Sequence, residues 1–251
     1  MKKRVLVTRA LEQGREFADL LQNLGLEPVV FPLIEFIPPK EKSKFEDAVN
    51  NLASYDWILL TSANAVRFFV KYLKTMKVDL SLIEGIKVCA VGPKTAEVAR
   101  ELSIKIDLIP DNFQAEGVIK SFQSLGIEGK KILFPRAEEG RAVLPEGLSA
   151  LGAEVSLVPV YQTVEPEGKE DELKNLLKNG LDVITFTSGS TVRNFVKIVG
   201  RENLALIKNI KIACISEVTA KVGRDQGFEV AIVASENTTQ SLAESIAKFF
   251  T

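Results

Sequence analysis

Small polar residues and two arginines stand at the ends of predicted strands, where helices begin. Such positions leave the first N–H groups of a helix without intrahelical acceptors and carry the positive end of the helix dipole. Both properties suit carboxylates or phosphates, so we expect an anionic ligand. The candidate binding residues are Thr8, Arg9, Ser62, Ala63, Asn64, Gly92, Thr95, Arg136, Thr187, Ser188, Gly189, Ser190, Ser216 and Thr219.

These residues also have an ordinary structural explanation. Serine and threonine commonly occupy the first positions of helices, where their hydroxyl groups accept backbone hydrogen bonds. Helix capping is therefore the alternative for Ser62, Thr95, Ser188 and Thr219. A plain surface charge is the alternative for Arg9 and Arg136. Repetition of the same residue types at successive strand ends favours ligand binding.

Tyr161 is the candidate proton donor. It alone of the three tyrosines lies in a predicted connection between domains, VPVYQTVEP, where its hydroxyl could donate a proton or a hydrogen bond. Packing of its ring is the alternative. The segment TSGS at 187–190 contains a glycine but lacks the spacing of a phosphate-binding loop or a dinucleotide fingerprint. We therefore expect no cofactor.

The composition excludes several kinds of chemistry. The chain contains no histidine, which rules out histidine-based triads and two-histidine metal sites. Cys89 and Cys214 lie far apart in apolar runs, where each is expected to be a buried thiol and not a metal ligand. Lys and Arg number 32 against 33 Asp and Glu, so the chain lacks the basic surplus expected for nucleic-acid binding.

Two observations bear on location. No run approaches the roughly 18 apolar residues needed to span a membrane. Arg9, Glu12 and Arg15 interrupt the apolar start long before the hydrophobic region of a signal peptide could form. We expect a cytoplasmic protein.

The chain repeats itself after about half its length. KRVLVTRALEQGREFADLLQNLGLEPVVFPL aligns without a gap with KKILFPRAEEGRAVLPEGLSALGAEVSLVPV, which pairs Arg9 with Arg136 at a separation of 127 residues. Later segments continue the match, with DWILLTSANAVRFFV facing DVITFTSGSTVRNFV and VGPKTAEVA facing ISEVTAKVG. Each copy has the size of a small domain, so the sequence predicts an internal duplication.

Within each copy, short β-branched runs alternate with amphipathic stretches. The first copy predicts strands at 4–8, 28–36, 57–61, 87–91 and 106–109, each followed by a helix, at 11–24, 44–52, 65–74, 94–102 and 115–125. Successive βα units favour a parallel sheet with helices on both faces. PLIEFIPP and PVYQTVEP end in prolines and are predicted to connect the two domains. Whether each copy folds on itself or exchanges its first βα unit stays open at this point.

The order and spacing of several motifs add a family resemblance over the whole chain. These motifs are VLVTR, LLTSANAV, CAVGPKTAEVARE with the following FQAEGV, ILFPRAEEGRAVLPEGLSALGAEV, VPVYQT and ITFTSGSTVRNF. The chain resembles the uroporphyrinogen-III synthase family. The resemblance implies two flavodoxin-like α/β lobes joined by a two-stranded linker, with a cleft between them. It assigns residues 1–35 and 164–251 to the first lobe, 38–161 to the second, and 36–37 and 162–163 to the connections.

The resemblance also implies an activity. The family are lyases of porphyrin and heme biosynthesis that cyclise hydroxymethylbilane, a linear tetrapyrrole with many carboxylates, and invert its last ring without a cofactor. Tyr161 matches the family's cleft tyrosine, and Thr8, Arg9, Ser62, Thr95, Ser188 and Thr219 match its cleft hydrogen bonders. One departure concerns the second copy, which has Ser216-Glu217 where the first has Gly92-Pro93. A monomer that receives its substrate transiently from hydroxymethylbilane synthase is expected.

Two other functions compete with this interpretation. A two-lobed binding protein would close over a small anion without chemistry. A flavodoxin-like enzyme would carry a flavin or a nucleotide. Conversion of hydroxymethylbilane excludes the first, and a colourless protein without nucleotide disfavours the second.

Overall fold

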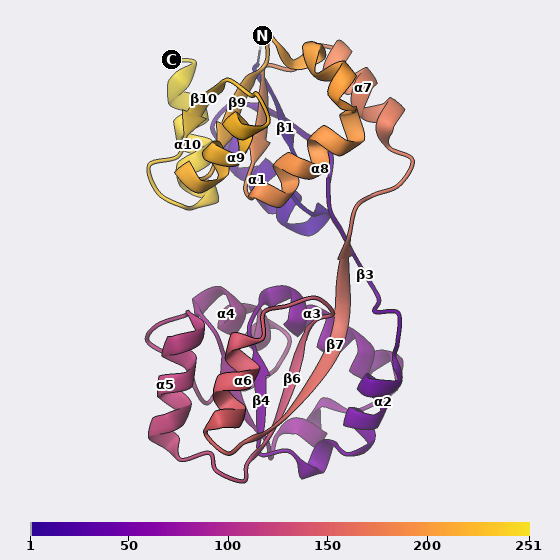
Figure 1. Cartoon of the computed structure of the whole chain (residues 1–251), viewed down its shortest axis with the longest axis vertical. Helices are drawn as coiled ribbons and strands as arrows, with labels where there is room; N and C mark the ends of the chain where they lie inside the picture. Colours follow the sequence, from indigo (N-terminus) through magenta and orange to yellow (C-terminus); the bar gives the residue numbers. More distant parts are fainter. Residues whose placement is uncertain (1) are drawn as a thin grey trace. The chain divides into compact units, whose positions relative to one another are not determined.

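The computed structural model describes residues 2–251, which form two compact units (Figure 1). Unit 1 comprises the chain up to Phe36 together with Val164–Thr251, and unit 2 comprises Ile37–Thr163. Each unit contains a five-stranded sheet. The predicted α/β class with parallel sheets is confirmed.

Unit 1 joins the two ends of the chain in one sheet. Its strand order is β10-β9-β8-β1-β2, and its pairings are parallel. The strands are β1 (Arg4–Val7), β2 (Glu27–Val30), β8 (Val183–Phe186), β9 (Lys211–Cys214) and β10 (Val230–Val233). Because β1 lies between β2 and β8, the first βα unit is built into the sheet formed by the last third of the chain.

Helices cover both faces of this sheet. On one face, α1 (Leu11–Asn23) and α10 (Thr239–Phe249) pack over a core that contains Phe17 and Leu21. The other face is covered by α7 (Glu170–Lys178), α8 (Gly189–Val199), α9 (Glu217–Asp225) and the 3₁₀ helix η3 (Arg201–Ile207). Their core includes the ring cluster of Phe186, Phe195 and Phe228. Burial of these apolar side chains fixes the sheet between two helical layers.

The sheet of unit 2 has the strand order β3-β7-β6-β4-β5, and its strands β3 and β7 cross the boundary between the units. The strands are β3 (Glu35–Ile37), β4 (Trp57–Leu60), β5 (Lys87–Ala90), β6 (Lys131–Ala137) and β7 (Glu154–Val164). On one face lie α5 (Ala115–Leu125) and α6 (Val143–Ala150), and on the other α2 (Ser43–Asn50), α3 (Ala63–Thr75) and α4 (Pro93–Glu101). The 3₁₀ helices η1 (Leu52–Ser54) and η2 (Leu80–Ile83) complete the unit.

Two predicted strands differ from the structure. The run predicted as one strand over 28–36 forms β2 and β3 with residues 31–34 between them, because β2 pairs with β1 in one sheet whereas β3 pairs with β7 in the other. The predicted strand over 106–109 is reduced to a single bridge between Leu108 and Cys89. Both differences lie at the edges of the sheets, where fewer neighbours enforce pairing.

In both sheets, an aspartate before a central strand accepts hydrogen bonds from the start of the neighbouring strand. Lys3 Nζ and the Arg4 N–H each donate to Asp182 at 2.8 Å, which ties the start of β1 to the start of β8. Lys130 Nζ and the Lys131 N–H donate in the same way to Asp56 at 2.9 Å, which ties β6 to β4. The carboxylates therefore set strand register at equivalent positions in both units.

Candidate functional site

The predicted site residues fall into two groups, one in each unit. In unit 1 they follow β1, β8 and β9, which are neighbours in the sheet. In unit 2 they follow β4 and β5 or lie near the ends of β6 and β7, and these strands are also neighbours. Since the carboxyl ends of parallel strands meet at one edge of a sheet, each unit gathers its candidates on one edge.

Three serines cap the helices that begin at these edges. Ser62 accepts a hydrogen bond from the Ala65 N–H at 3.1 Å, Ser188 from Thr191 at 3.2 Å and Ser216 from Thr219 at 3.3 Å. Capping of this kind stabilises a helix by about 1 kcal/mol. These hydroxyl oxygens therefore already serve α3, α8 and α9, while the neighbouring amides of Ala63, Asn64, Gly189 and Ser190 begin the same helices.

Thr8 is used inside the sheet of unit 1. Its hydroxyl is fully buried and donates to the Thr185 carbonyl at 2.6 Å. Thr185 in turn donates to the Leu6 carbonyl at 2.8 Å, so two hydroxyls cross-link β1 and β8. Ligand contact at Thr8 would have to come from the backbone.

Arg9 carries an unused donor. Its Nη2 donates to Gln13 at 3.1 Å, but its buried Nε has no hydrogen-bond partner among residues 2–251. Burial lowers the pKa of the guanidinium, and the charge of Glu16 offsets part of that shift. A buried donor without an acceptor is costly unless a ligand supplies one. Arg9 is therefore suited to receive a carboxylate at the start of α1.

Arg136 lies beside a pocket of about 570 Å³ in unit 2. Its Nη1 donates to the Arg141 carbonyl at 3.1 Å, and its guanidinium lies 5.4 Å from the centre of the Phe134 ring. Gly140 makes room for it, since a Cβ there would come within 1.4 Å of Nη2. Val155, Leu157 and Pro159 of β7 form an apolar wall of the pocket.

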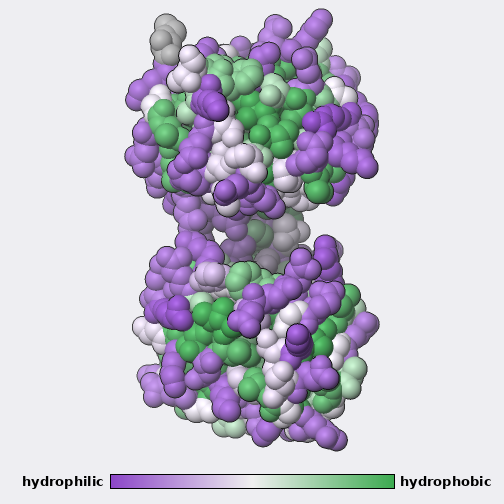
Figure 2. All heavy atoms as spheres, turned by 90° about the vertical axis from the view of Figure 1, so that its left-hand side faces the viewer, coloured by the Kyte–Doolittle hydropathy of each residue, from purple (hydrophilic) through white to green (hydrophobic). Residues whose placement is uncertain are grey.

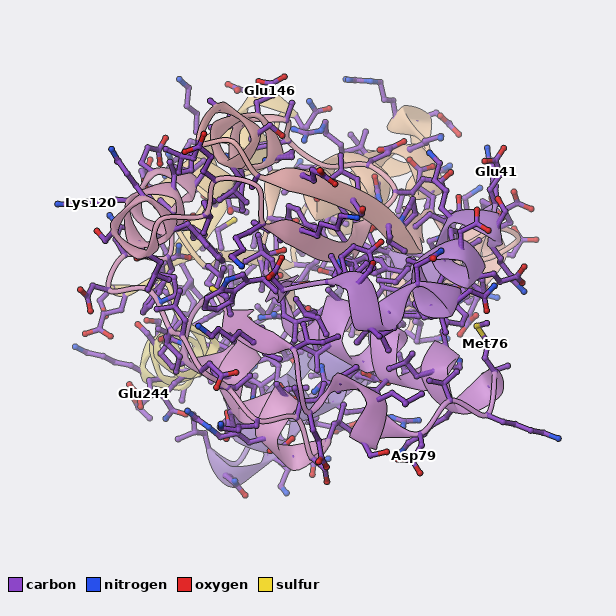
Figure 3. The ribbon with its side chains drawn as sticks, turned by 90° about the horizontal axis from the view of Figure 1, so that it is seen from below. Glu41, Met76, Asp79, Lys120, Glu146 and Glu244 are labelled. Atoms are coloured by element: carbon purple, nitrogen blue, oxygen red, sulfur yellow. The ribbon has the colours of Figure 1, made fainter. Side chains whose placement is uncertain are left out.

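Acidic side chains near this pocket face solvent. Glu146 of α6 also lines the pocket but is exposed, and Figure 3 shows it at the periphery of the view, apart from Lys120 of α5. The guanidinium of Arg136, by contrast, is a partly buried positive charge beside this pocket.

The start of α4 differs from the capped helices. Gly92 adopts a φ of 94°, Pro93 follows at the first helical position, and no side chain caps the helix. A residue with a side chain rarely adopts that φ, so glycine is required for this turn. Thr95 is buried in the first turn, with 6% of its surface exposed. The first amides of α4 are thereby left without a side-chain acceptor.

Tyr161 lies within β7, close to the end of that strand. Its ring is 8% exposed and stacks on Phe68 with centroids 5.2 Å apart and planes 24° apart. Its carbonyl accepts a hydrogen bond from Glu138 at 2.7 Å, next to a register shift between β6 and β7. Burial lowers the pKa of Arg136, and interaction with Tyr161 offsets part of that shift, so the two side chains are electrostatic neighbours.

The residues missed by the sequence interpretation are apolar. Of nine large hydrophobic side chains that are exposed among residues 2–251, four lie at or just before the starts of helices that follow the carboxyl ends of strands: Leu11, Phe113, Val143 and Val218. Their position in the sequence, next to the polar candidate residues, was the signal that could have found them.

Figure 2 shows hydrophobic residues interspersed with hydrophilic ones on the face it draws. Among the described residues no helix is long and apolar enough to cross a membrane.

Comparisons with known proteins agree on one family. The family model described as uroporphyrinogen-III synthase HemD matches residues 15–244. The uroporphyrinogen-III synthase of Synechococcus elongatus is 32% identical over 253 residues, covering 98% of this chain and 95% of its own. The crystal structure of the Helicobacter pylori synthetase matches with a TM-score of 0.65 at 18% identity and covers 100% of both chains. A mutant synthase from Thermus thermophilus gives a TM-score of 0.61 at 18% identity, covering 100% of this chain and 99% of its own.

Proposed function

The chain belongs to the uroporphyrinogen-III synthase family, lyases of tetrapyrrole biosynthesis, and we propose that it converts hydroxymethylbilane to uroporphyrinogen III. The match extends over nearly the whole chain in both directions. Family membership is shown by the comparisons, whereas the substrate and the roles of individual residues are proposed.

The observation that carries the site assignment is the buried Nε of Arg9, which lacks a hydrogen-bond partner among residues 2–251. A tetrapyrrole with acetate and propionate arms on its rings offers acceptors for this donor. The uncapped first turns of α1, α4 and α6 offer amide donors at equivalent strand ends. Amides and guanidinium groups together bind carboxylates without requiring a large net positive charge.

The proposed reaction begins with loss of water from the terminal hydroxymethyl group. The resulting azafulvene attacks the substituted position of the last ring, and the spiro intermediate breaks its bond to the neighbouring methylene carbon and closes again with that ring inverted. A proton is delivered to the leaving hydroxyl and one is later lost from the ring, so atoms and charge balance. The enzyme must mainly hold a flexible chain in one conformation.

Tyr161 is proposed as the hydrogen-bond or proton donor to the leaving hydroxyl. It lies near Arg136 at the carboxyl end of β7, and stacking on Phe68 limits the motion of its ring. General acid assistance from a tyrosine fits a chain without histidine. Gly92, Thr95, Thr187, Ser188, Ser190 and Thr219 are proposed to contribute backbone or hydroxyl contacts.

Location and assembly remain predictions. A cytoplasmic monomer that receives substrate transiently from hydroxymethylbilane synthase is the expected state. Size-exclusion chromatography with light scattering at assay concentrations measures the assembly, and channelling assays with both enzymes measure the transfer.

The decisive experiment supplies freshly prepared hydroxymethylbilane to the purified chain and separates the ring isomers of the product. Excess type III isomer over the enzyme-free control supports the proposal. Only type I isomer contradicts it and favours the alternative of a binding protein, whose affinity for the linear tetrapyrrole is then measured by titration.

A further inference from the structure

Phe113 is an aromatic side chain that the fold leaves in solvent at the carboxyl edge of the unit 2 sheet. Its surface is 51% exposed, whereas nine other phenylalanines are at most 6% exposed. It follows the bridge residue Leu108 and precedes α5, so it lies among the loops that carry the candidate binding residues. An aromatic ring in water forgoes the stabilisation that burial would provide.

The ring has a defined place over the start of α4. A Cβ built on Gly92 would lie 3.6 Å from Cγ of Phe113 and 3.9 Å from two further ring carbons, so the backbone of Gly92 passes close beneath the ring. The same glycine has a φ of 94° and no side chain to cover the ring. One side of the ring is therefore supported by backbone, and half of its surface is free.

The loop that holds Phe113 is packed tightly. Asn112 Oδ1 accepts a hydrogen bond from the Gln114 N–H at 2.9 Å, which closes a turn around Phe113. A Cβ on Gly117 would lie 2.4 Å from the Asn112 carbonyl oxygen, so only glycine in α5 allows the loop to approach this closely. The turn and the close approach both restrict where the ring can lie.

The neighbouring groups define what the ring would meet. Lys94 and Thr95 supply the next backbone amides of α4, which no side chain caps. A ligand that contacts both features needs a flat apolar ring bearing a carboxylate arm. A pyrrole ring with its acetate or propionate group has this chemistry, and stacking of such rings on an aromatic side chain is favourable.

We infer that Phe113 packs against one pyrrole ring of the tetrapyrrole and thereby positions that ring for cyclisation. The inference rests on the proposed function, since it assigns a ring contact to the same substrate. Phe113 acts through binding and takes no part in proton transfer.

The test compares Phe113→Ala, Phe113→Leu and Phe113→Tyr in the full-length protein with freshly made hydroxymethylbilane. We expect Phe113→Ala to raise KM about 3- to 20-fold with kcat changed less than about twofold. Phe113→Tyr retains the flat ring and should restore KM, and Phe113→Leu should lie between. Phe249→Ala is the matched control, because Phe249 is 46% exposed at the C-terminal end of α10.

A second measurement separates this inference from the proposed function. Titration with uroporphyrin III, followed by porphyrin fluorescence, measures ring binding without turnover. Weaker binding by Phe113→Ala but not by Phe249→Ala supports the ring contact even if the chain makes no type III isomer. Unchanged KM and unchanged uroporphyrin affinity in Phe113→Ala, in an active and folded protein, overturn the inference and leave the proposed function standing.

Discussion

Two helices whose first residues align when the two halves of the sequence are compared begin in different ways. In unit 1, Ser216 caps α9, and Glu217 forms an ion pair with Arg224 of the same helix. In unit 2, α4 begins with Gly92 and Pro93, has no side-chain cap and lies beside the exposed ring of Phe113. The first start is satisfied by its own side chains, whereas the first amides of the second have no side-chain acceptor. Two stretches that align in the sequence therefore begin their helices with different hydrogen-bond partners.

The same contrast holds for Arg9, which follows β1, and Arg136, which lies near the end of β6. Arg9 has a buried Nε without a partner, whereas Arg136 donates to the Arg141 carbonyl and lies over the ring of Phe134. Arg9 thus keeps an unused donor in a poorly solvated place. Arg136 is already held by its own unit and lies beside an open pocket.

The largest expected effect concerns this pair. Arg9→Met should raise KM for hydroxymethylbilane about 10- to 100-fold, because a charge-assisted hydrogen bond to a partly buried group is lost. Arg136→Met should raise it about 3- to 10-fold, and the exposed Arg15→Met serves as the control. Steady-state kinetics with isomer separation measure all three. Equal effects for Arg9 and Arg136 would remove the proposed distinction between the units.

The second largest effect is expected for replacement of Tyr161. Ile34 stands at its matching position in unit 1, so the hydroxyl is particular to unit 2. Tyr161→Phe should lower kcat about 10-fold and leave KM nearly unchanged, since a leaving group loses its hydrogen bond while the ring still packs on Phe68. Single-turnover measurements separate the chemical step from release. An unchanged rate would exclude Tyr161 from the mechanism.

Asp56 and Asp182 form the same hydrogen bonds at strand starts in the two units, so their replacement should have similar effects on stability. Hydrogen bonds from Lys130 and the Lys131 N–H lower the pKa of Asp56. For Asp182, desolvation acts upward, but the hydrogen bonds from Lys3 and Arg4 outweigh it and the pKa is lowered as well. A carboxylate with a depressed folded-state pKa stabilises the fold above its unfolded pKa of about 4, and the contribution is lost as the pH falls through the folded value.

Asp56→Asn and Asp182→Asn should therefore each reduce stability by about 1 kcal/mol at neutral pH, with a smaller difference below pH about 4. Denaturant titrations at several pH values measure this. The exposed Asp19→Asn is the control. A loss that stays constant through the acid range would show that the charge of these aspartates is not responsible.

The smallest effect is expected for a variant in which the first residues of α9 are replaced by those of α4. Replacing Ser216 by Gly and Glu217 by Pro gives α9 the first residues of α4. We expect KM to fall about two- to fivefold, because uncapped amides become available to a carboxylate and a nearby negative charge is removed. Thermal unfolding checks that the fold is retained. A higher KM in a folded variant would show that the Ser216 hydroxyl itself contacts the substrate.

The sequence by itself determined the alternation of strands and helices and the parallel class. Apolar periodicity decides which stretches form helices, and α5 begins and ends where the pattern predicts. Gly25 and Gly152 follow α1 and α6 with φ of 80° and 83°, as expected for glycines that end helices. These features depend on residues close together in the chain, so a local pattern is sufficient to predict them.

The tertiary structure alone decided what each polar residue does. Residue type allowed Ser62 to cap or to bind, and the position of the Ala65 amide shows that it caps. Thr8 was an equal candidate for ligand contact until the neighbouring strand placed the Thr185 carbonyl within 2.6 Å. The unused Nε of Arg9 and the exposed ring of Phe113 likewise depend on what the fold places around them. Hydrogen-bond partners and burial are set by groups distant in sequence, and no local pattern records them.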